Sequence, residues 1–238
     1  MKSEILEKGC QILELSISEK QEEQFMRYYE LLVEWNKVMN LTGITEFDEV
    51  MRKHFLDSLS IVKAIEKKEN IRILDVGTGA GFPGIPLKIM FPEWDVVLLD
   101  SLNKRIKFLN EVIEQLGLER ICTIHGRAED FARKEEYREK FDLVVSRAVA
   151  NLSSLSEYCL PYVKEQGIFV SYKASNVEEE VKEAKKAVTV LGGSLDKIVE
   201  FQLPDTDIDR TLLVIQKIKK TSGKYPRKAG LPSKEPIR

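Results

Sequence analysis

The sequence lacks long apolar runs and has few cysteines. None of its 238 residues lies in a run approaching the roughly eighteen apolar residues that a membrane-spanning helix requires. The segment Met1-Lys2-Ser3-Glu4 has no apolar core of a secretion signal. Cys10, Cys122 and Cys159 are scattered without metal-ligand spacing, which favours buried, reduced thiols. We therefore expect a cytoplasmic protein with no membrane anchor and no metal.

Histidine is scarce as well. The only two, His54 and His125, lie far apart and belong to no metal-ligand or catalytic-triad pattern. Structural roles are favoured for both. His125 ends an expected strand, so it is the histidine expected near a cleft, with its side chain turned away.

Charge is nearly balanced overall but unevenly distributed. The net charge is −2, yet residues 217–238 carry eight Lys or Arg against one Glu, a local charge of +7 that leaves −2 − 7 = −9 for the rest. The net charge argues against a protein that coats nucleic acid with a uniformly basic surface. A basic tail on an acidic body instead indicates a local contact with a polyanion, the alternative being a disordered, solubilising tail.

Residues 1–70 are expected to be helical. Ser18-Glu19-Lys20-Gln21 has the form of a capping box, and Asn40-Leu41-Thr42-Gly43 ends the helix that follows. A further helix is expected from about Asp48 to Ile65. Between the capping box and Asn40, aromatic and apolar residues recur at three- and four-residue spacing: Phe25, Tyr28, Tyr29, Leu32, Trp35 and Met39.

From residue 71 onward, short apolar runs alternate with helical patterns. This alternation predicts a doubly wound, Rossmann-like α/β fold with a parallel sheet and helices on both faces. We expect a helical extension over 1–70, a ligand-binding α/β domain over 71–218 and a basic tail over 219–238. The expected strands are Ile71–Val76, Val96–Leu99, Ile121–His125, Phe141–Ser146, Ile168–Tyr172, 194–203 and 211–218; the expected helices are Ile85–Phe91, Lys104–Leu116 and Val177–Leu191.

The most informative segment is the glycine-rich turn after the first strand, residues 75–84. Read from Gly79 it is G-x-G-x-x-G, a dinucleotide-binding pattern; read from Asp75 it is D-x-G-x-G, typical of loops that wrap the methionine half of S-adenosylmethionine. Asp75 is placed to hold that ligand's ammonium group, and Pro83 does not suit a pyrophosphate nest. The chain is also short for a second nucleotide-binding half, so a methyltransferase is favoured over a dehydrogenase.

Two later strands end in acidic residues that suit an adenosine. Asp100 ends the second strand, where a carboxylate can accept hydrogen bonds from both ribose hydroxyls in either cofactor class. After the third strand, Glu129 lies where an adenine amine would be. It can equally be an acid favoured by the start of a helix.

The fourth strand ends in Ser146-Arg147-Ala148. Carboxyl ends of strands line the cleft of a doubly wound sheet, so we expect Arg147 to face cofactor or substrate. Methyltransferases acting on exocyclic amines carry an Asn/Asp-Pro-Pro-Tyr motif here, which this sequence lacks. The exocyclic amines of adenine and cytosine are therefore disfavoured as targets.

With these segments, the chain resembles the RsmG (GidB) family, small-subunit ribosomal RNA methyltransferases acting on N7 of guanine. The resemblance runs nearly end to end. Its motifs are Trp35-Asn36, Met39-Asn40-Leu41-Thr42, His54-Phe55-Leu56-Asp57-Ser58-Leu59, Asp75 to Pro86, Ser146-Arg147-Ala148 and Tyr225-Pro226-Arg227-Lys228-Ala229-Gly230 with Pro232. The family resemblance leads us to expect Lys followed by Gly, whereas this chain has Tyr172-Lys173-Ala174. The difference weakens any role for Lys173.

The resemblance implies S-adenosylmethionine as cofactor and 16S rRNA, naked or in a small-subunit particle, as substrate of a monomeric enzyme. It implies roles for Arg127 and Arg210, which with Arg147 would position the substrate. The implied cofactor residues are Gly77, Phe82, Ala128, Glu129 and Arg147, beside Asp75, Gly79 and Asp100 from the loop reading. In the tail, Lys224, Arg227 and Lys228 would contact phosphates and Tyr225 would stack on a base.

Guanine N7 has a free lone pair at neutral pH, so no general base is expected, and the transfer rate at saturating RNA should be nearly independent of pH from about 6 to 9. Two other functions stay open. A small-molecule methyltransferase is disfavoured by the basic tail and Arg127. A noncatalytic RNA- or ribosome-binding protein is disfavoured by the intact set of Asp75, Gly77, Gly79 and Asp100.

Overall fold

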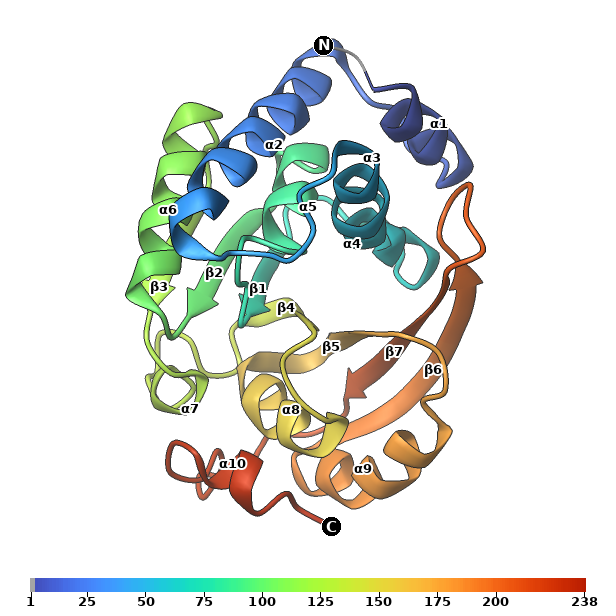
Figure 1. Ribbon diagram of the computed structural model, residues 1–238. Helices are drawn as coiled ribbons and strands as arrows, with labels where there is room; N and C mark the ends of the chain where they lie inside the picture. Colours follow the sequence, from blue (N-terminus) through green and yellow to red (C-terminus); the bar gives the residue numbers. More distant parts are fainter. Residues whose placement is uncertain (1–2) are drawn as a thin grey trace.

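A seven-stranded sheet runs through the centre of the computed structural model, which describes residues 3–238 (Figure 1). Its strand order is β3-β2-β1-β4-β5-β7-β6; the first five strands are parallel, and β7 is antiparallel to both of its neighbours. The expectation of a doubly wound α/β fold is confirmed. The strands are β1 (Arg72–Val76), β2 (Asp95–Asp100), β3 (Ile121–His125), β4 (Phe141–Arg147), β5 (Val163–Lys173), β6 (Gly193–Gln202) and β7 (Asp209–Lys217).

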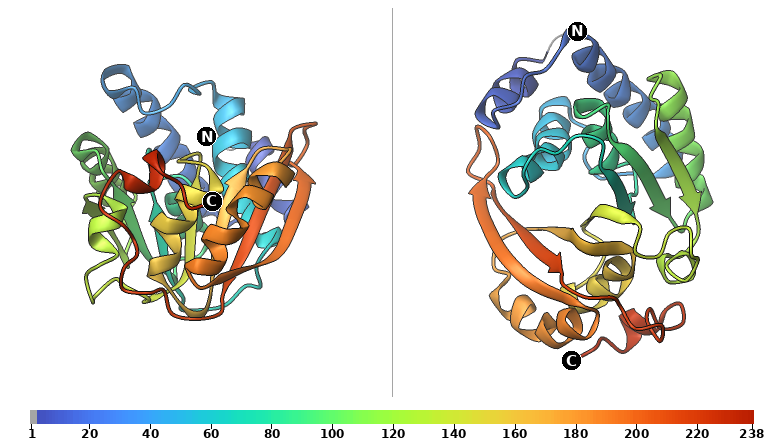
Figure 2. Two further views of the ribbon diagram at one scale, coloured as in Figure 1. Left: turned by 90° about the horizontal axis from the view of Figure 1, so that it is seen from below. Right: turned by 180° about the vertical axis from the view of Figure 1, so that it is seen from behind.

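Helices cover both faces of the sheet (Figures 1 and 2). Successive residues of β1 alternate between two cores: Ile73 packs in the cluster shared with the N-terminal helices, and Leu74 in the cluster shared with the later helices. The first face carries α1 (Glu4–Ile12), α2 (Glu19–Met39), α5 (Gly84–Met90) and α6 (Asn103–Gln115); the second carries α8 (Leu152–Cys159), η3 (Leu160–Tyr162) and α9 (Glu178–Val190).

The boundaries of α2 match the sequence signals. Ser18 and Gln21 form the expected capping box, and Asn40 ends the helix in the left-handed conformation. The expected apolar face is buried where Phe25 and Tyr28 pack against Phe55. Tyr28 also packs against Phe82 and donates a hydrogen bond to the carbonyl of Ala80, which joins α2 to the glycine-rich turn after β1.

The helix expected from Asp48 to Ile65 is not one regular helix. It consists of α3 (Phe47–Val50), the π-helical turn η1 (Met51–Leu56), α4 (Asp57–Leu59) and the 3-10 turn η2 (Ser60–Lys63). The apolar periodicity is present, but it does not reveal the change in winding. π turns are rare and often mark functional sites, and η1 carries Lys53 and His54 to the wall of a cavity.

Short helices α7 (Ala128–Phe131) and α10 (Leu231–Lys234) complete the fold. The sequence analysis did not predict α8 or α10, and it gave a helix start at Glu129, now in α7, only as one of two alternatives. Cys10 and Cys159 are buried, whereas Cys122 on β3 is exposed, so the expectation of a buried thiol is wrong there. Within residues 3–238, no helix has the length and apolarity needed to cross a membrane, and no cluster of His, Cys, Asp and Glu suits a metal ion.

Candidate functional site

The glycine loop lies where the chain leaves β1, next to β4 at the point where the strand order reverses. The backbone amides of Gly77 and Thr78 donate to the carbonyl of Leu99 at 2.9 and 3.1 Å, which docks the loop on β2. Gly77 has φ of +72°, and a Cβ there would lie 2.6 Å from Cγ2 of Val149. Both the backbone conformation and the available space therefore require glycine at this position.

Asp75 lies beneath this loop and is fully buried. Its Oδ2 accepts hydrogen bonds from Oγ1 of Thr78 at 2.7 Å and from the backbone amide of Gly84 at 2.9 Å, while its buried Oδ1 has no hydrogen-bond partner within residues 3–238. Burial raises the pKa of Asp75 to about 6. The sequence analysis expected this carboxylate to hold the cofactor's ammonium group. In the structure it holds the loop and does not line the adjacent cavity.

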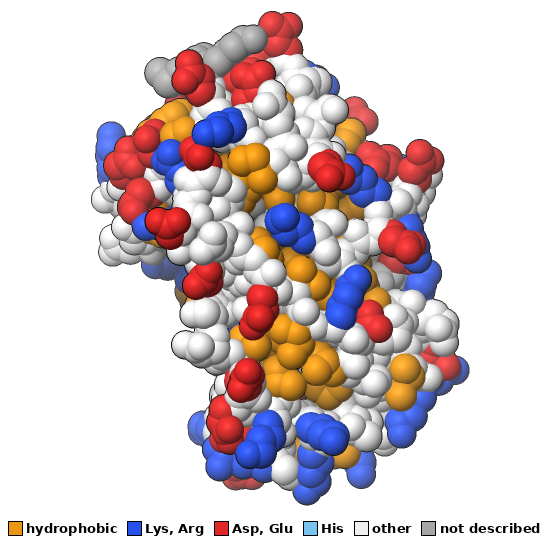
Figure 3. All heavy atoms as spheres, turned by 90° about the vertical axis from the view of Figure 1, so that its right-hand side faces the viewer, with side chains coloured by type: hydrophobic (Ala, Val, Ile, Leu, Met, Phe, Trp, Pro, Cys, Tyr) orange, Lys and Arg blue, Asp and Glu red, His pale blue; other side chains and the backbone are white. Residues whose placement is uncertain are grey.

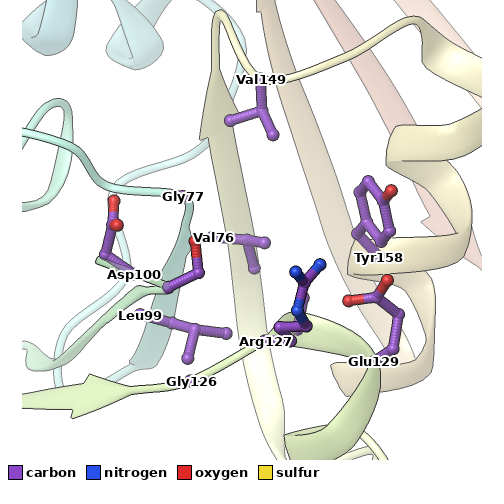
Figure 4. Close-up of a pocket in the computed structure, with 11 residues that line it drawn as sticks. Val76, Gly77, Leu99, Asp100, Gly126, Arg127, Glu129, Val149 and Tyr158 are labelled. Atoms are coloured by element: carbon purple, nitrogen blue, oxygen red, sulfur yellow. The ribbon is translucent and has the colours of Figure 1, made fainter. Parts of the chain in front are cut away.

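A cavity of about 170 Å³ opens at the carboxyl ends of β1, β2 and β3 (Figure 4). Gly77, Asp100, Arg127, Ala128 and Glu129 line it, all of them expected site residues. Its remaining wall comes from Val76, Leu99, Ser101, Gly126, Val149 and Tyr158. Figure 4 shows Arg127, Glu129 and Tyr158 on one side of this first cavity and Asp100 with Leu99 on the other.

Asp100 is buried and already accepts three hydrogen bonds. Oδ2 receives the amide of Gly79 at 2.9 Å and Nη1 of Arg105 at 3.1 Å; Oδ1 receives the amide of Leu102 at 2.9 Å. A carboxylate offers about four acceptor positions, so capacity remains on Oδ1. Asp100 thus joins the glycine loop to β2. Gly79, expected to bind cofactor, lies outside the lining and contributes this amide instead.

Glu129 is buried in the first turn of α7, which begins after Arg127. Its Oε1 accepts a hydrogen bond from the backbone amide of Gly230 at 2.8 Å. Two roles were open for Glu129, meeting an adenine amine or favouring a helix start, and its position suits both. The contact with the C-terminal segment was missed, because no local pattern relates residues a hundred positions apart.

A second cavity, of about 390 Å³, lies beside the first along the segment that leaves β4. Val149 lines the first cavity, and Arg147 with Ala148 lines the second. The other residues of the second cavity are Lys53, His54, Asp57, Tyr172, Lys173, Ala174 and Arg210. Arg147, expected among the cofactor residues, thus lies at the second cavity.

Asp57 brings two of the expected arginines together. Its Oδ2 lies 2.7 Å from Nη1 of Arg147, and its Oδ1 lies 2.9 Å from Nε of Arg210. The Asp57 carboxylate is buried, so both ion pairs are partly shielded from solvent. Lys173 is held separately, by Glu180 at 2.6 Å.

His54 stacks on Phe82 beside these arginines, with ring centroids 4.4 Å apart. Nη2 of Arg147 lies 3.3 Å from Nδ1 of His54, and Oγ1 of Thr42 lies 2.8 Å from Nε2. Because the guanidinium can only donate, Nδ1 accepts and Nε2 carries the proton. Burial, with the nearby Arg147 charge, lowers the pKa of His54 to about 3. The buried Phe82, expected at the cofactor, lies under Arg147 and outside the first cavity.

The placement of the two histidines corrects the sequence analysis, which expected His125 to be the histidine near the cleft. His54 lies at the second cavity, while His125 is exposed, with Nε2 3.2 Å from the carbonyl of Ser101. The sequence signal for His54 and Asp57 was their shared motif, residues 54–59. Tyr158 and Val149 had no such signal.

The C-terminal segment packs on the body instead of forming a detached tail. Arg227 binds the buried Glu157, with Nη2 2.7 Å from Oε2, so its guanidinium is engaged within the chain. Tyr225 packs half-buried against the second core, and the ammonium group of Lys224 lies 5.4 Å from the centroid of its ring. Lys217 is buried as well. Lys224 and Lys228 are exposed, as expected for phosphate contacts.

Known proteins share both the sequence and the fold of this chain. The family model described as rRNA small subunit methyltransferase G matches residues 21–211. The protein named ribosomal RNA small subunit methyltransferase G from Lachnoclostridium phytofermentans is 57% identical, over 96% of this chain and 95% of its own. The protein of the same name from Desulforamulus reducens is 56% identical, over 98% of this chain and 97% of its own.

Solved structures share the fold at low sequence identity. M. jannaschii TYW2, in complex with AdoMet, has a TM-score of 0.51 at 18% identity, covering 66% of this chain and 73% of its own. TrmN from Thermus thermophilus has a TM-score of 0.52 at 14% identity, and the match covers 71% of this chain and 53% of TrmN. The structures support the methyltransferase-type sheet, and on the family model and the full-length relatives the chain belongs to the rRNA small subunit methyltransferase G (GidB) family.

Proposed function

We propose that this chain transfers a methyl group from S-adenosylmethionine to N7 of a guanine in 16S rRNA. The observation that carries the proposal is the pair of cavities sharing the Arg147-Ala148-Val149 segment. One has the lining that a nucleoside requires, and its neighbour holds two arginines. A methyl donor bound in one cavity and a methyl acceptor bound in the other would meet at the carboxyl end of β4.

The first cavity suits the cofactor. Gly77 lines the cavity with backbone alone, so a ligand can approach the main chain there, and the remaining acceptor position on Asp100 suits a ribose hydroxyl. Because Gly230 holds Oε1 of Glu129, Oε2 is the oxygen that would meet an adenine amine. Leu99 and Val149 provide apolar surface for the ring. S-adenosylmethionine supplies an electrophilic methyl group on a sulfonium.

The second cavity suits the target base. Guanine presents acceptors at O6 and N7, and guanidinium groups are the usual donors to that edge. Arg147 and Arg210, fixed in direction by Asp57, would orient the base through O6 and phosphate while leaving N7 open. His54 is neutral above pH of about 3 and accepts from Arg147 at Nδ1, so it is not free to remove a proton. The chemistry proposed requires none.

RNA would reach the site over exposed basic residues. Arg127, Lys224 and Lys228 are exposed, and Lys53 lies on the rim of the second cavity. Figure 3 shows Lys and Arg side chains gathered at the lower end of one face, at the level of α9 and the C-terminus. In this proposal the chain acts as a monomer in the cytoplasm, on 16S rRNA as naked RNA or within a small-subunit particle.

Mapping methylated guanines tests the proposal. RNA of the small subunit is isolated from cells with and without this gene, reduced, and cleaved with aniline, which cuts at N7-methylguanine. One cleavage site should disappear without the gene and return with the wild-type gene. An unchanged cleavage pattern, with methyl transfer instead to another position or to a small molecule, would refute the N7 assignment.

A further inference from the structure

We infer that residues 226–234 of the C-terminal segment complete the first cavity by positioning Glu129 and Tyr158, and thereby link RNA contact at the tail to cofactor affinity. This inference rests on the proposed function for the identity of the two ligands. The contacts themselves belong to this chain and can be tested without methyl transfer.

The first contact is made to Glu129. The backbone amide of Gly230 donates to Oε1 at 2.8 Å, while the same carboxylate lines the cavity. One oxygen is therefore held by the C-terminal segment, and the other is left for a donor on the ligand. Gly230 has φ of +86°, a left-handed conformation that glycine adopts without strain. The direction of the Glu129 side chain thus depends on a residue a hundred positions away.

The second set of contacts is made to α8, which carries Tyr158 on the cavity wall. Glu157, the preceding residue, is fully buried; it accepts from the backbone amide of Arg227 at 2.7 Å and from Nε at 3.0 Å. Without Arg227, this buried carboxylate would lose its charged partner. One turn earlier, Oγ of Ser154 donates to the carbonyl of the buried Pro232 at 2.6 Å.

Tyr158 follows Glu157 directly on α8, so the contacts made to Glu157 and Ser154 fix the turn that carries it. Burial raises the pKa of Tyr158. Residues 226–234 therefore hold both acidic and aromatic parts of the cavity wall, on α7 and on α8. A cofactor site built this way is incomplete when the segment is displaced.

Exposed lysines lie within this segment and next to it. Lys224, Lys228 and Lys234 flank the anchoring residues Arg227 and Gly230. A polyanion bound to these lysines would favour one position of the segment, and that position bears on Glu129. Any such effect of RNA on cofactor affinity is matched by an equal effect of cofactor on RNA affinity.

Calorimetry with S-adenosylhomocysteine tests the positioning role in the full-length protein. Arg227→Ala should weaken S-adenosylhomocysteine binding roughly tenfold, the scale of one charge-assisted contact. The matched control is Arg120→Ala, which removes an arginine paired with Asp95 at 2.9 Å outside the lining of both cavities. It should leave affinity unchanged. Should Arg227→Ala not fold, Ser154→Ala removes only the Pro232 anchor and should weaken binding in the same direction.

A 16S rRNA transcript added to the titration tests the link. It should tighten S-adenosylhomocysteine binding to the wild type and lose that effect on Arg227→Ala. Affinity unchanged in a folded Arg227→Ala variant, or RNA that tightens both proteins equally, would overturn the inference. A wild type that binds S-adenosylhomocysteine in a tail-dependent way yet leaves 16S rRNA unmethylated would instead refute the proposed function.

Discussion

Gly77 combines a left-handed backbone with a close approach to a side chain, since a Cβ there would lie 2.6 Å from Cγ2 of Val149. Gly77→Ala should therefore strain the turn by about 1 kcal/mol or more and push Val149 into the first cavity. We expect a large loss of S-adenosylhomocysteine affinity in calorimetry. Gly43→Ala is the control, because no atom of the described residues lies within 4 Å of a Cβ there. Equal affinities of the two variants would contradict this account of the loop.

His54 should make the fold sensitive to acid. Its pKa is about 3 in the folded protein against an ordinary value of 6.5, so between these values the unfolded chain binds more protons. The free energy of unfolding is therefore lost as the pH falls from about 6.5 toward 3, by at most about 1.4 kcal/mol per pH unit from this group. Urea unfolding of wild type and His54→Asn between pH 4 and 7 measures it.

The wild type should lose more stability than His54→Asn over that interval. His125→Asn, which replaces the exposed histidine, should follow the wild type. If the pH profiles of wild type and His54→Asn are parallel, then His54 is protonated in the folded protein and the neutral tautomer assigned to it is incorrect.

The methyl-transfer rate should not vary between pH 7 and 9. In this range Asp75, with a pKa of about 6, is ionised, His54 is neutral, and arginine side chains stay protonated. Single-turnover rates at saturating RNA measure the profile, with the stability of protein and RNA checked at each pH. A rise with pH that disappears in His54→Asn would show that this histidine acts as a base.

At the scale of elements, the C-terminal segment combines two roles that a deletion would remove together. Removing 219–238 would take the lysines proposed to contact phosphate and also the partner of buried Glu157. Deleting the tail should therefore disturb the packing of the fold as well as remove positive charge. Replacing only the exposed lysines of the segment tests the effect of its charge on RNA binding without removing its packing contacts.

The variant Lys224→Ala/Lys228→Ala/Lys234→Ala should weaken 16S rRNA binding and keep the fold. Each lost phosphate contact reduces the slope of log affinity against log salt by roughly 0.7 to 0.9. Filter binding at several salt concentrations gives this slope. A control removes three exposed lysines that lie outside the C-terminal segment: Lys20, Lys37 and Lys67. An identical slope in both triple variants would exclude the tail as the RNA contact.

At the scale of the whole molecule, Asp57 joins the N-terminal helices to the carboxyl end of the sheet through Arg147 on β4 and Arg210 on β7. Asp57→Asn leaves two shielded arginines without a counter-charge. We expect a loss of roughly 2 to 3 kcal/mol in the free energy of unfolding, below the range for fully buried pairs because both arginines are partly exposed.

RNA methylation should fall in Asp57→Asn with little change in S-adenosylhomocysteine affinity, because Asp57 lines only the second cavity. Asp48→Asn is the control from the same segment: its exposed carboxylate pairs with Arg52 at 3.5 Å and should contribute less than about 1 kcal/mol. Unfolding in urea and rRNA methylation assays compare the two. An Asp57→Asn protein as stable and active as Asp48→Asn would contradict the proposed bridge.

Local patterns in the sequence determined the sheet, the capping of α2 by Ser18 and Gln21, and the glycine loop with Asp100. Each depends on neighbouring residues, through apolar periodicity, a side chain reaching a nearby amide, or a turn that only glycine permits. The same kind of signal placed Arg127 and Glu129 at a strand end, where doubly wound sheets form their clefts.

Only the tertiary structure decided which of these side chains remain available to a ligand. Asp75 is engaged by its own loop, Arg227 by Glu157, and Arg147 by Asp57. These partners lie between three and ninety positions apart along the chain, and pairing depends on how helices dock on the sheet. Charge and motif identify a residue able to bind; burial and the geometry of its neighbours determine what it binds.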